Sequence, residues 1–280
     1  MPKKYHMKQL VLFILVGMVL LSSCQNSDQT NTENAGVKET GVNVTINEKN
    51  EAVIVIPDET AGEKPIPIGL ARDTIIPSGN DNDLTPEEKE RRLELRRAKT
   101  AFNNGMQYYQ EGNYPEAINA FKMVLQMDET NDKAFFNLGK IYAMQGQPEL
   151  SLSYYEDAVR LNPNDSASWL GIGMIYYNRG DFENALKYYN RSIEAGPGYA
   201  LAYYNRGTVA GQSKNYAESI ADLTTAIRLD PNSDQAYMNR GLAYYYSKQT
   251  DKACLDWNKA AELGNPEAIK AVSLYCTDKK

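Results

Sequence analysis

Residues 132–165 read DKAFFNLGKIYAMQGQPELSLSYYEDAVRLNPND, and the pattern of this stretch recurs through the second half of the 280-residue chain. Its first glycine, Gly139, belongs to a series of glycines spaced 34 residues apart: Gly105, Gly139, Gly173, Gly207 and Gly241. A glycine inside a helix costs about 1 kcal/mol relative to alanine. The regular series therefore indicates a point in each repeat where two helices approach closely.

Other positions keep the same period, which is the signature of a repeat architecture. Each glycine is followed after twelve residues by a small residue and after sixteen by a large one: Ala117/Phe121, Ser151/Tyr155, Ala185/Tyr189, Ser219/Leu223 and Ala253/Trp257. Prolines fall where a unit ends and a helix must stop, at Pro163, Pro197 and Pro231. The pattern predicts two helices joined by a turn in every unit.

This pattern resembles the tetratricopeptide repeat (TPR), a helix–turn–helix unit of the same length. The resemblance implies an all-α fold, a right-handed α-α solenoid of five units at 98–131, 132–165, 166–199, 200–233 and 234–267. Residues 268–280 predict a capping helix, which a solenoid needs to cover its last apolar face. Units four and five depart from the family, because Arg206 and Arg240 stand where an aliphatic residue is usual.

A helix is also expected before the first unit. Thr85-Pro86-Glu87-Glu88 combines an N-cap residue, a first-turn proline and a glutamate at the capping-box position. These residues predict a leading helix over 85–97.

The resemblance implies that the first helix of each unit lines a concave surface, with positions 2, 5, 9, 12 and 13 facing it and an Asn at position 6 as a polar contact. Aromatic and Met side chains dominate this set, and an apolar stripe of that kind usually marks a partner site. We expect it to bind a segment of another protein. The alternative is that the face packs against the chain's own N-terminal segment or a second copy. The candidate residues are Phe102, Met106, Tyr109, Phe136, Asn137, Met144, Leu170, Met174, Tyr177, Tyr204, Asn205, Met238, Asn239, Leu242 and Tyr245.

One known TPR specificity is not predicted. Family members that clamp a C-terminal carboxylate need Lys at position 5 and Asn at position 9 of one unit. Here those places hold Phe102 and Met106, or Phe136 and Lys140. Binding of chaperone tails is therefore not expected.

The first 23 residues have the pattern of an export signal. Basic residues precede a twelve-residue apolar run over 10–21, which is too short to span a membrane. The following Leu21-Ser22-Ser23-Cys24 resembles a bacterial lipobox, which implies acylation (palmitate) of Cys24 and a membrane anchor. The alternative is a plain secretory signal with an incidental Cys. Gln25 carries no retention signal of the Asp type, so we expect the outer membrane of the cell envelope, facing periplasm or surface.

Residues 24–84 predict a flexible acidic tether. Residues 24–85 hold four basic and eleven acidic side chains and no aromatic residue, a composition that does not support a packed core. Residues 42–56 alternate in the manner of a β-hairpin, which in isolation is marginally stable. The hairpin is either transient or pairs with something else.

Composition excludes several function classes. His6 is the only histidine, so a mature chain has none for a triad or a common zinc site. The net charge of −6 argues against nucleic acid. We expect no catalytic residues, no metal and no cofactor. Cys254 and Cys276 could form a disulfide in an exported protein, or could be two buried thiols.

Together these features predict a membrane-anchored TPR adaptor or scaffold lipoprotein that binds a segment of a partner envelope protein. Its build resembles TPR lipoproteins that serve as adaptors for cell-wall hydrolases or as pilotins. The alternative is a structural, self-assembling envelope lipoprotein.

Overall fold

The computed structural model describes residues 43–46, 52–55 and 84–276. The chain divides into two compact units, Met1–Ile66 and Pro67–Lys280, which are treated separately below. The predicted signal peptide, Cys24 and most of the predicted tether lie outside the described residues.

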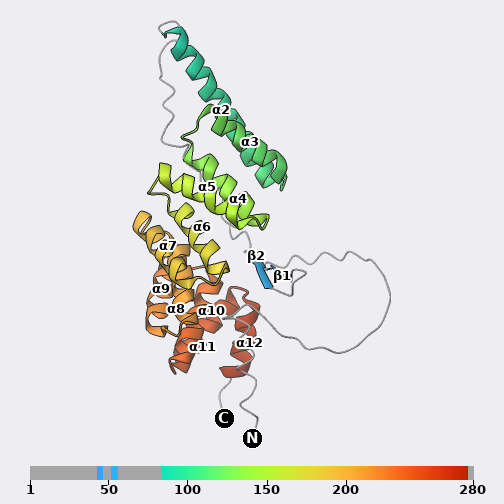
Figure 1. Ribbon diagram of the computed structural model, residues 1–280. Helices are drawn as coiled ribbons and strands as arrows, with labels where there is room; N and C mark the ends of the chain where they lie inside the picture. Colours follow the sequence, from blue (N-terminus) through green and yellow to red (C-terminus); the bar gives the residue numbers. More distant parts are fainter. Residues whose placement is uncertain (1–42, 47–51, 56–83, 277–280) are drawn as a thin grey trace, which may run out of the picture. The chain divides into compact units, whose positions relative to one another are not determined.

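The compact unit Pro67–Lys280 is all-helical over its described residues, as predicted (Figure 1). Each helix packs against its neighbours in the chain, and the second helix of one pair packs against the first helix of the next. The helices are α2 (Pro86–Gln110), α3 (Tyr114–Met127), α4 (Asp132–Met144), α5 (Pro148–Leu161), α6 (Ser166–Asn178), α7 (Phe182–Ala195), α8 (Ala200–Gln212), α9 (Tyr216–Leu229), α10 (Asp234–Tyr246), α11 (Thr250–Glu262) and α12 (Pro266–Tyr275).

The periodic glycines lie where the two helices of a pair are closest. A Cβ built on Gly173 of α6 would lie 2.6 Å from the ring of Tyr189 on α7. The same addition at Gly139 would lie 2.8 Å from the ring of Tyr155. The large residue of each repeat therefore occupies the space that a side chain on the first helix would need.

The small residues between them are fully enclosed. Ala117, Ala185 and Ala253 have no exposed surface, and neither has Ser151. The Ser151 hydroxyl donates a 2.8 Å hydrogen bond to the carbonyl of Gly139, which satisfies the one polar group at this contact.

The turn inside each pair requires a left-handed backbone conformation. Gly112, Gly146 and Gly180 take it with φ of 75°, 68° and 76°. In units four and five the same place holds Lys214 and Lys248, both with φ of 64°. Only glycine adopts this region without a steric cost, so the two lysine turns carry strain that the first three do not.

The helical stack begins and ends slightly differently from the prediction. Thr85 and Glu88 form the predicted capping box, with backbone-to-side-chain bonds of 2.7 and 3.2 Å. The predicted leading helix is not a separate element, because α2 runs unbroken into the first helix of unit one. The capping helix begins at Pro266 rather than at 268, since Asn265 caps it by accepting from the amide of Ala268.

A disulfide joins Cys254 on α11 to Cys276 at the end of α12. Next to it, the ring of Tyr275 lies 5.4 Å from Tyr245 and 5.9 Å from Trp257. The capping helix is therefore attached both covalently and through an aromatic cluster.

In the compact unit Met1–Ile66, β1 (Asn43–Ile46) and β2 (Ala52–Val55) pair antiparallel, with Asn43 opposite Val55 and Ile46 opposite Ala52. These strands fall within the stretch whose alternation predicted a hairpin.

Among the helices of residues 84–276, none combines the length and apolar character that a transmembrane segment needs.

Candidate functional site

The candidate site is the surface formed by the predicted groove positions of α2, α4, α6, α8 and α10, the first helices of the five units. Ten of the fifteen predicted residues keep part of their surface exposed. They are Met106, Tyr109, Phe136, Met144, Met174, Tyr177, Tyr204, Asn205, Asn239 and Tyr245.

The other five predicted groove residues are buried, so their prediction as surface contacts is corrected. Phe102 is 8% exposed and packs edge-on against Phe121 at 5.4 Å between ring centroids. Leu170, Met238 and Leu242 are 3–4% exposed because they fill the interior between helices. The fifth is Asn137, which is 3% exposed.

The asparagines at position 6 use their amide groups inside the protein. The amides of Asn137 and Asn205 donate to the carbonyls of Lys133 and Leu201, four residues earlier in the same helix, at 2.7 and 2.8 Å. The Asn239 amide donates to Tyr204 and Thr208 of the preceding repeat, at 3.2 Å each. A bound peptide would have to compete for these N–H groups.

Groove residues of successive repeats contact one another. The Tyr109 hydroxyl lies 3.4 Å from the sulfur of Met144, and Tyr177 is hydrogen-bonded to Gln212. In both pairs the partners are 35 residues apart, one repeat plus one position. Burial raises the pKa of the Tyr177 phenol above its ordinary value. These contacts hold side chains of neighbouring repeats against one another.

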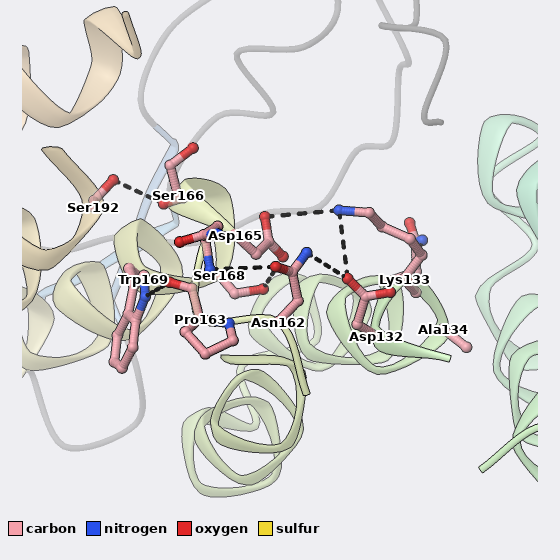
Figure 2. A network of polar contacts seen from close by, with 12 residues as sticks. Asp132, Lys133, Ala134, Asn162, Pro163, Asp165, Ser166, Ser168, Trp169 and Ser192 are labelled. Atoms are coloured by element: carbon pink, nitrogen blue, oxygen red, sulfur yellow. Dashed lines mark hydrogen bonds and ion pairs between the residues drawn. The ribbon is translucent and has the colours of Figure 1, made fainter. Parts of the chain in front are cut away.

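A polar network connects α4 with the loop between α5 and α6 and with the start of α6 (Figure 2). Asn162 donates to the Asp132 carboxylate at 2.7 Å, and Lys133 lies 3.9 Å from both Asp132 and Asp165. Ser168 donates to Asp165 at 2.6 Å. Lys133 stands at position 2 of unit two, one of the predicted groove positions.

Two ion pairs were not predicted from the sequence. Arg206 pairs with Asp222, and Arg240 pairs with Asp256, each pair bridging the two helices of its own unit. The signal was present, because arginine at position 7 and aspartate at position 23 occur together in units four and five.

Within 84–276, no group of three or more His, Cys, Asp or Glu side chains is arranged to hold a metal ion.

Stacked antiparallel helix pairs with a 34-residue period define the class of α-helical repeat proteins. Segments of the chain match family models of the tetratricopeptide repeat. The models of the TPR repeat match residues 105–146 and 211–247, and that of the tetratricopeptide repeat matches 145–200.

Solved structures share the fold. MamA is 27% identical, with a TM-score of 0.51 over 59% of this chain and 96% of its own. YrrB, described as a TPR protein with an unusual peptide-binding site, is 18% identical, with a TM-score of 0.52 over 68% of this chain and 99% of its own. PilF of Pseudomonas aeruginosa is 16% identical, with a TM-score of 0.57 over 66% of this chain and 95% of its own. Comparison with curated proteins gave no match.

Proposed function

We propose that this protein is a lipid-anchored adaptor that binds a segment of another envelope protein in its concave surface and has no enzymatic activity. The observation that carries the proposal is the row of partly exposed Tyr, Met, Phe and Asn side chains along the first helices of the repeats. Tyrosine and methionine are favoured in interfaces because they combine large contact area with polar or adaptable groups.

The similar structures support a binding role. The description of YrrB names a peptide-binding site on a TPR protein, and the fold of this chain matches it over nearly all of that structure. A solenoid presents a long surface with few internal constraints, which suits recognition of an extended segment.

Substitutions within the groove test the binding role. Phe136→Asp, Met174→Asp and Tyr204→Asp, combined, place carboxylates in partly buried apolar surface and should abolish recovery of the partner after crosslinking in cells. The helical circular dichroism should be unchanged.

The matched control places the same residue outside the groove. Met123, Leu150 and Leu255 are 52%, 46% and 72% exposed on second helices, and their replacement by Asp should leave partner recovery intact. Partner recovery that survives the groove variant would refute the proposal.

The lipid anchor is proposed from the sequence around Cys24. Growth with labelled palmitate should label the protein, and cell fractionation should recover it in the outer-membrane fraction. Cys24→Ala should lose both, whereas Ser22→Ala should keep them, because a small residue remains before the Cys. Label on the Cys24→Ala variant would contradict the anchor.

Self-assembly is the second candidate function. It is favoured by apolar side chains exposed at the C-terminal end of the stack, Leu255 at 72%, Ile269 at 55% and Leu274 at 59%. Light scattering of the non-lipidated chain, residues 25–280, separates the two. A monomer supports the adaptor and an oligomer supports self-assembly.

A further inference from the structure

Two polar atoms in units three and four are buried and have no hydrogen-bond partner among the described residues. They are the hydroxyl of Tyr189 on α7 and the side-chain oxygen of Gln212 on α8. A buried polar group that makes no hydrogen bond costs free energy, and nearly all such groups in native proteins are paired. The two atoms therefore require an explanation.

The core does not need the hydroxyl of Tyr189. Tyr189 stands at position 24 of its unit, and Phe121 and Leu223 fill the same position in units one and four without any polar atom. Unit five has Trp257 there, and its indole N–H donates to the carbonyl of Met238 at 3.3 Å. The hydroxyl in unit three is thus neither required for packing nor satisfied by the described residues around it.

Both atoms lie beside the candidate site. The amide of Gln212 donates a hydrogen bond to the hydroxyl of Tyr177 on α6, and both residues are partly exposed at predicted groove positions. After burial, the nearby phenols of Tyr177 and Tyr204 are the next causes that raise the pKa of Tyr189, so the three hydroxyl groups lie near one another. The two unpartnered atoms are therefore covered by side chains that themselves reach the groove surface.

One chemical group complements both atoms. The oxygen of Gln212 only accepts hydrogen bonds, whereas the phenol O–H of Tyr189 can donate one. A carboxamide supplies an N–H for the first and a carbonyl oxygen for the second. A carboxylate or an ammonium group would be buried there without a counterion, because the predicted groove positions of units three to five hold no charged side chain.

We infer that the partner segment inserts an Asn or Gln side chain between α6 and α8, where its carboxamide donates to the oxygen of Gln212 and accepts from the hydroxyl of Tyr189. The inference rests on the proposed function and adds the chemistry that the groove recognises. A side chain is needed rather than the peptide backbone, because both protein atoms are buried below the surface on which an extended backbone would lie.

Entry of the carboxamide requires the partly exposed side chains of Tyr177 and Gln212, which are joined by a hydrogen bond, to move apart. Selectivity follows from the polar atoms that a wrong residue leaves unpaired. A site built to hydrogen-bond a polar group discriminates strongly against an analogue that lacks it.

Selection from a phage-displayed library of random linear peptides tests this, with the non-lipidated chain, residues 25–280, immobilised as bait. Asn and Gln should be enriched over the unselected library at one position, flanked by apolar residues. A selected peptide should bind the Tyr189→Phe chain roughly tenfold more weakly, because one buried hydrogen bond is lost and the carboxamide oxygen is left unpaired. Urea denaturation should show that this variant is as stable as the unmodified chain.

Two controls separate recognition from a general effect on the fold. Tyr155→Phe makes the same change at the same position of unit two and should leave peptide binding unchanged. A peptide whose selected Asn or Gln is replaced by Leu should bind the unmodified chain and the Tyr189→Phe chain equally, since the contact that the two changes share is then already absent. Equal weakening of the selected peptide by Tyr155→Phe and Tyr189→Phe would overturn the inference.

Other outcomes also overturn it. Unweakened binding to Tyr189→Phe would mean that a buried water, rather than the partner, satisfies the two atoms. Selected peptides without enrichment of Asn or Gln, or a library that yields no binder, would refute the carboxamide. Peptides of the first kind that fail to bind the Phe136→Asp/Met174→Asp/Tyr204→Asp chain would leave the proposed function standing. Failure of the proposed function has a different signature, namely partner recovery in cells that those three substitutions do not affect.

Discussion

Arg240 on α10 donates two hydrogen bonds to Asp256 on α11, from Nε at 2.8 Å and from Nη2 at 2.7 Å. Its Nη1 donates at 3.1 Å to Thr224 on α9 of the preceding repeat. These bonds to Asp256 raise the pKa of Arg240 above its usual value. Arg206 repeats the arrangement with Asp222 and Asn190. Each arginine therefore joins the two helices of its unit to the unit before.

Removing one partner of this pair should be costly. The side chains of Arg240 and Asp256 are 15% and 9% exposed, so Asp256→Ala leaves a largely buried charge without its counterion. We expect the free energy of unfolding to fall by about 3 kcal/mol, measured by urea denaturation. The double variant Arg240→Met/Asp256→Leu should recover most of that loss, because neither charge remains.

An exposed pair provides the comparison. Arg191 and Glu194 are 59% and 64% exposed, so Glu194→Ala should cost less than about 1 kcal/mol. If the losses in free energy of unfolding caused by Arg240→Met and by Asp256→Leu simply add in the double variant, the two side chains are not coupled, which would contradict the prediction.

The close contact at Gly173 gives a second prediction. Alanine there would normally gain about 1 kcal/mol in helix propensity. Its Cβ would meet the ring of Tyr189 at 2.6 Å, and Tyr189 is fully buried, so the ring cannot move aside. We expect Gly173→Ala to destabilise the fold by a net 1–3 kcal/mol, about the cost of overpacking. Gly198→Ala, where nothing lies within 4 Å of the added Cβ, should be near neutral. A stabilised Gly173→Ala variant would show that the helices separate easily.

The contrast between these contacts and the groove shows what a repeating sequence can predict. The Gly173–Tyr189 contact recurs in nearly the same form in other units, for example at Gly139 and Tyr155. The 34-residue period of the sequence is therefore sufficient to predict it. Groove exposure varies from unit to unit: Phe102 and Phe136 share position 5, yet only Phe136 keeps exposed surface. Burial there is therefore not determined by the position in the repeat alone. The pairing of Arg206 with Asp222 could have been predicted, because both departures occur in the same two units.

The buried hydroxyl of Tyr189 has no hydrogen-bond partner in the part of the chain that the structure describes. Tyr189→Phe removes an unsatisfied polar group without leaving a cavity in the ring's place. We expect the free energy of unfolding at neutral pH to stay unchanged or rise by about 1 kcal/mol. A loss well above 1 kcal/mol would mean that the hydroxyl is bonded after all.

The same residue should contribute to alkaline instability. Burial raises the pKa of Tyr189 above the ordinary value of 10.0. Above that pH the unfolded chain releases the phenol proton while the folded chain retains it, so stability falls as pH rises. Urea midpoints at about pH 8 and pH 10.5 should therefore differ less in Tyr189→Phe than in the unmodified protein. An identical difference in both would contradict the shifted pKa.

The disulfide between Cys254 and Cys276 should stabilise the end of the stack. The two residues are 22 apart in sequence, and a closed loop of that length contributes about 3 kcal/mol in the chain-entropy model. Cys254→Ser/Cys276→Ser should lose about that much stability, with faster amide hydrogen exchange concentrated in α12, where Tyr275 packs on Tyr245 and Trp257. A thiol assay under denaturing, non-reducing conditions should find neither Cys254 nor Cys276 reactive, and two reactive thiols from a protein kept under oxidising conditions would contradict the bond.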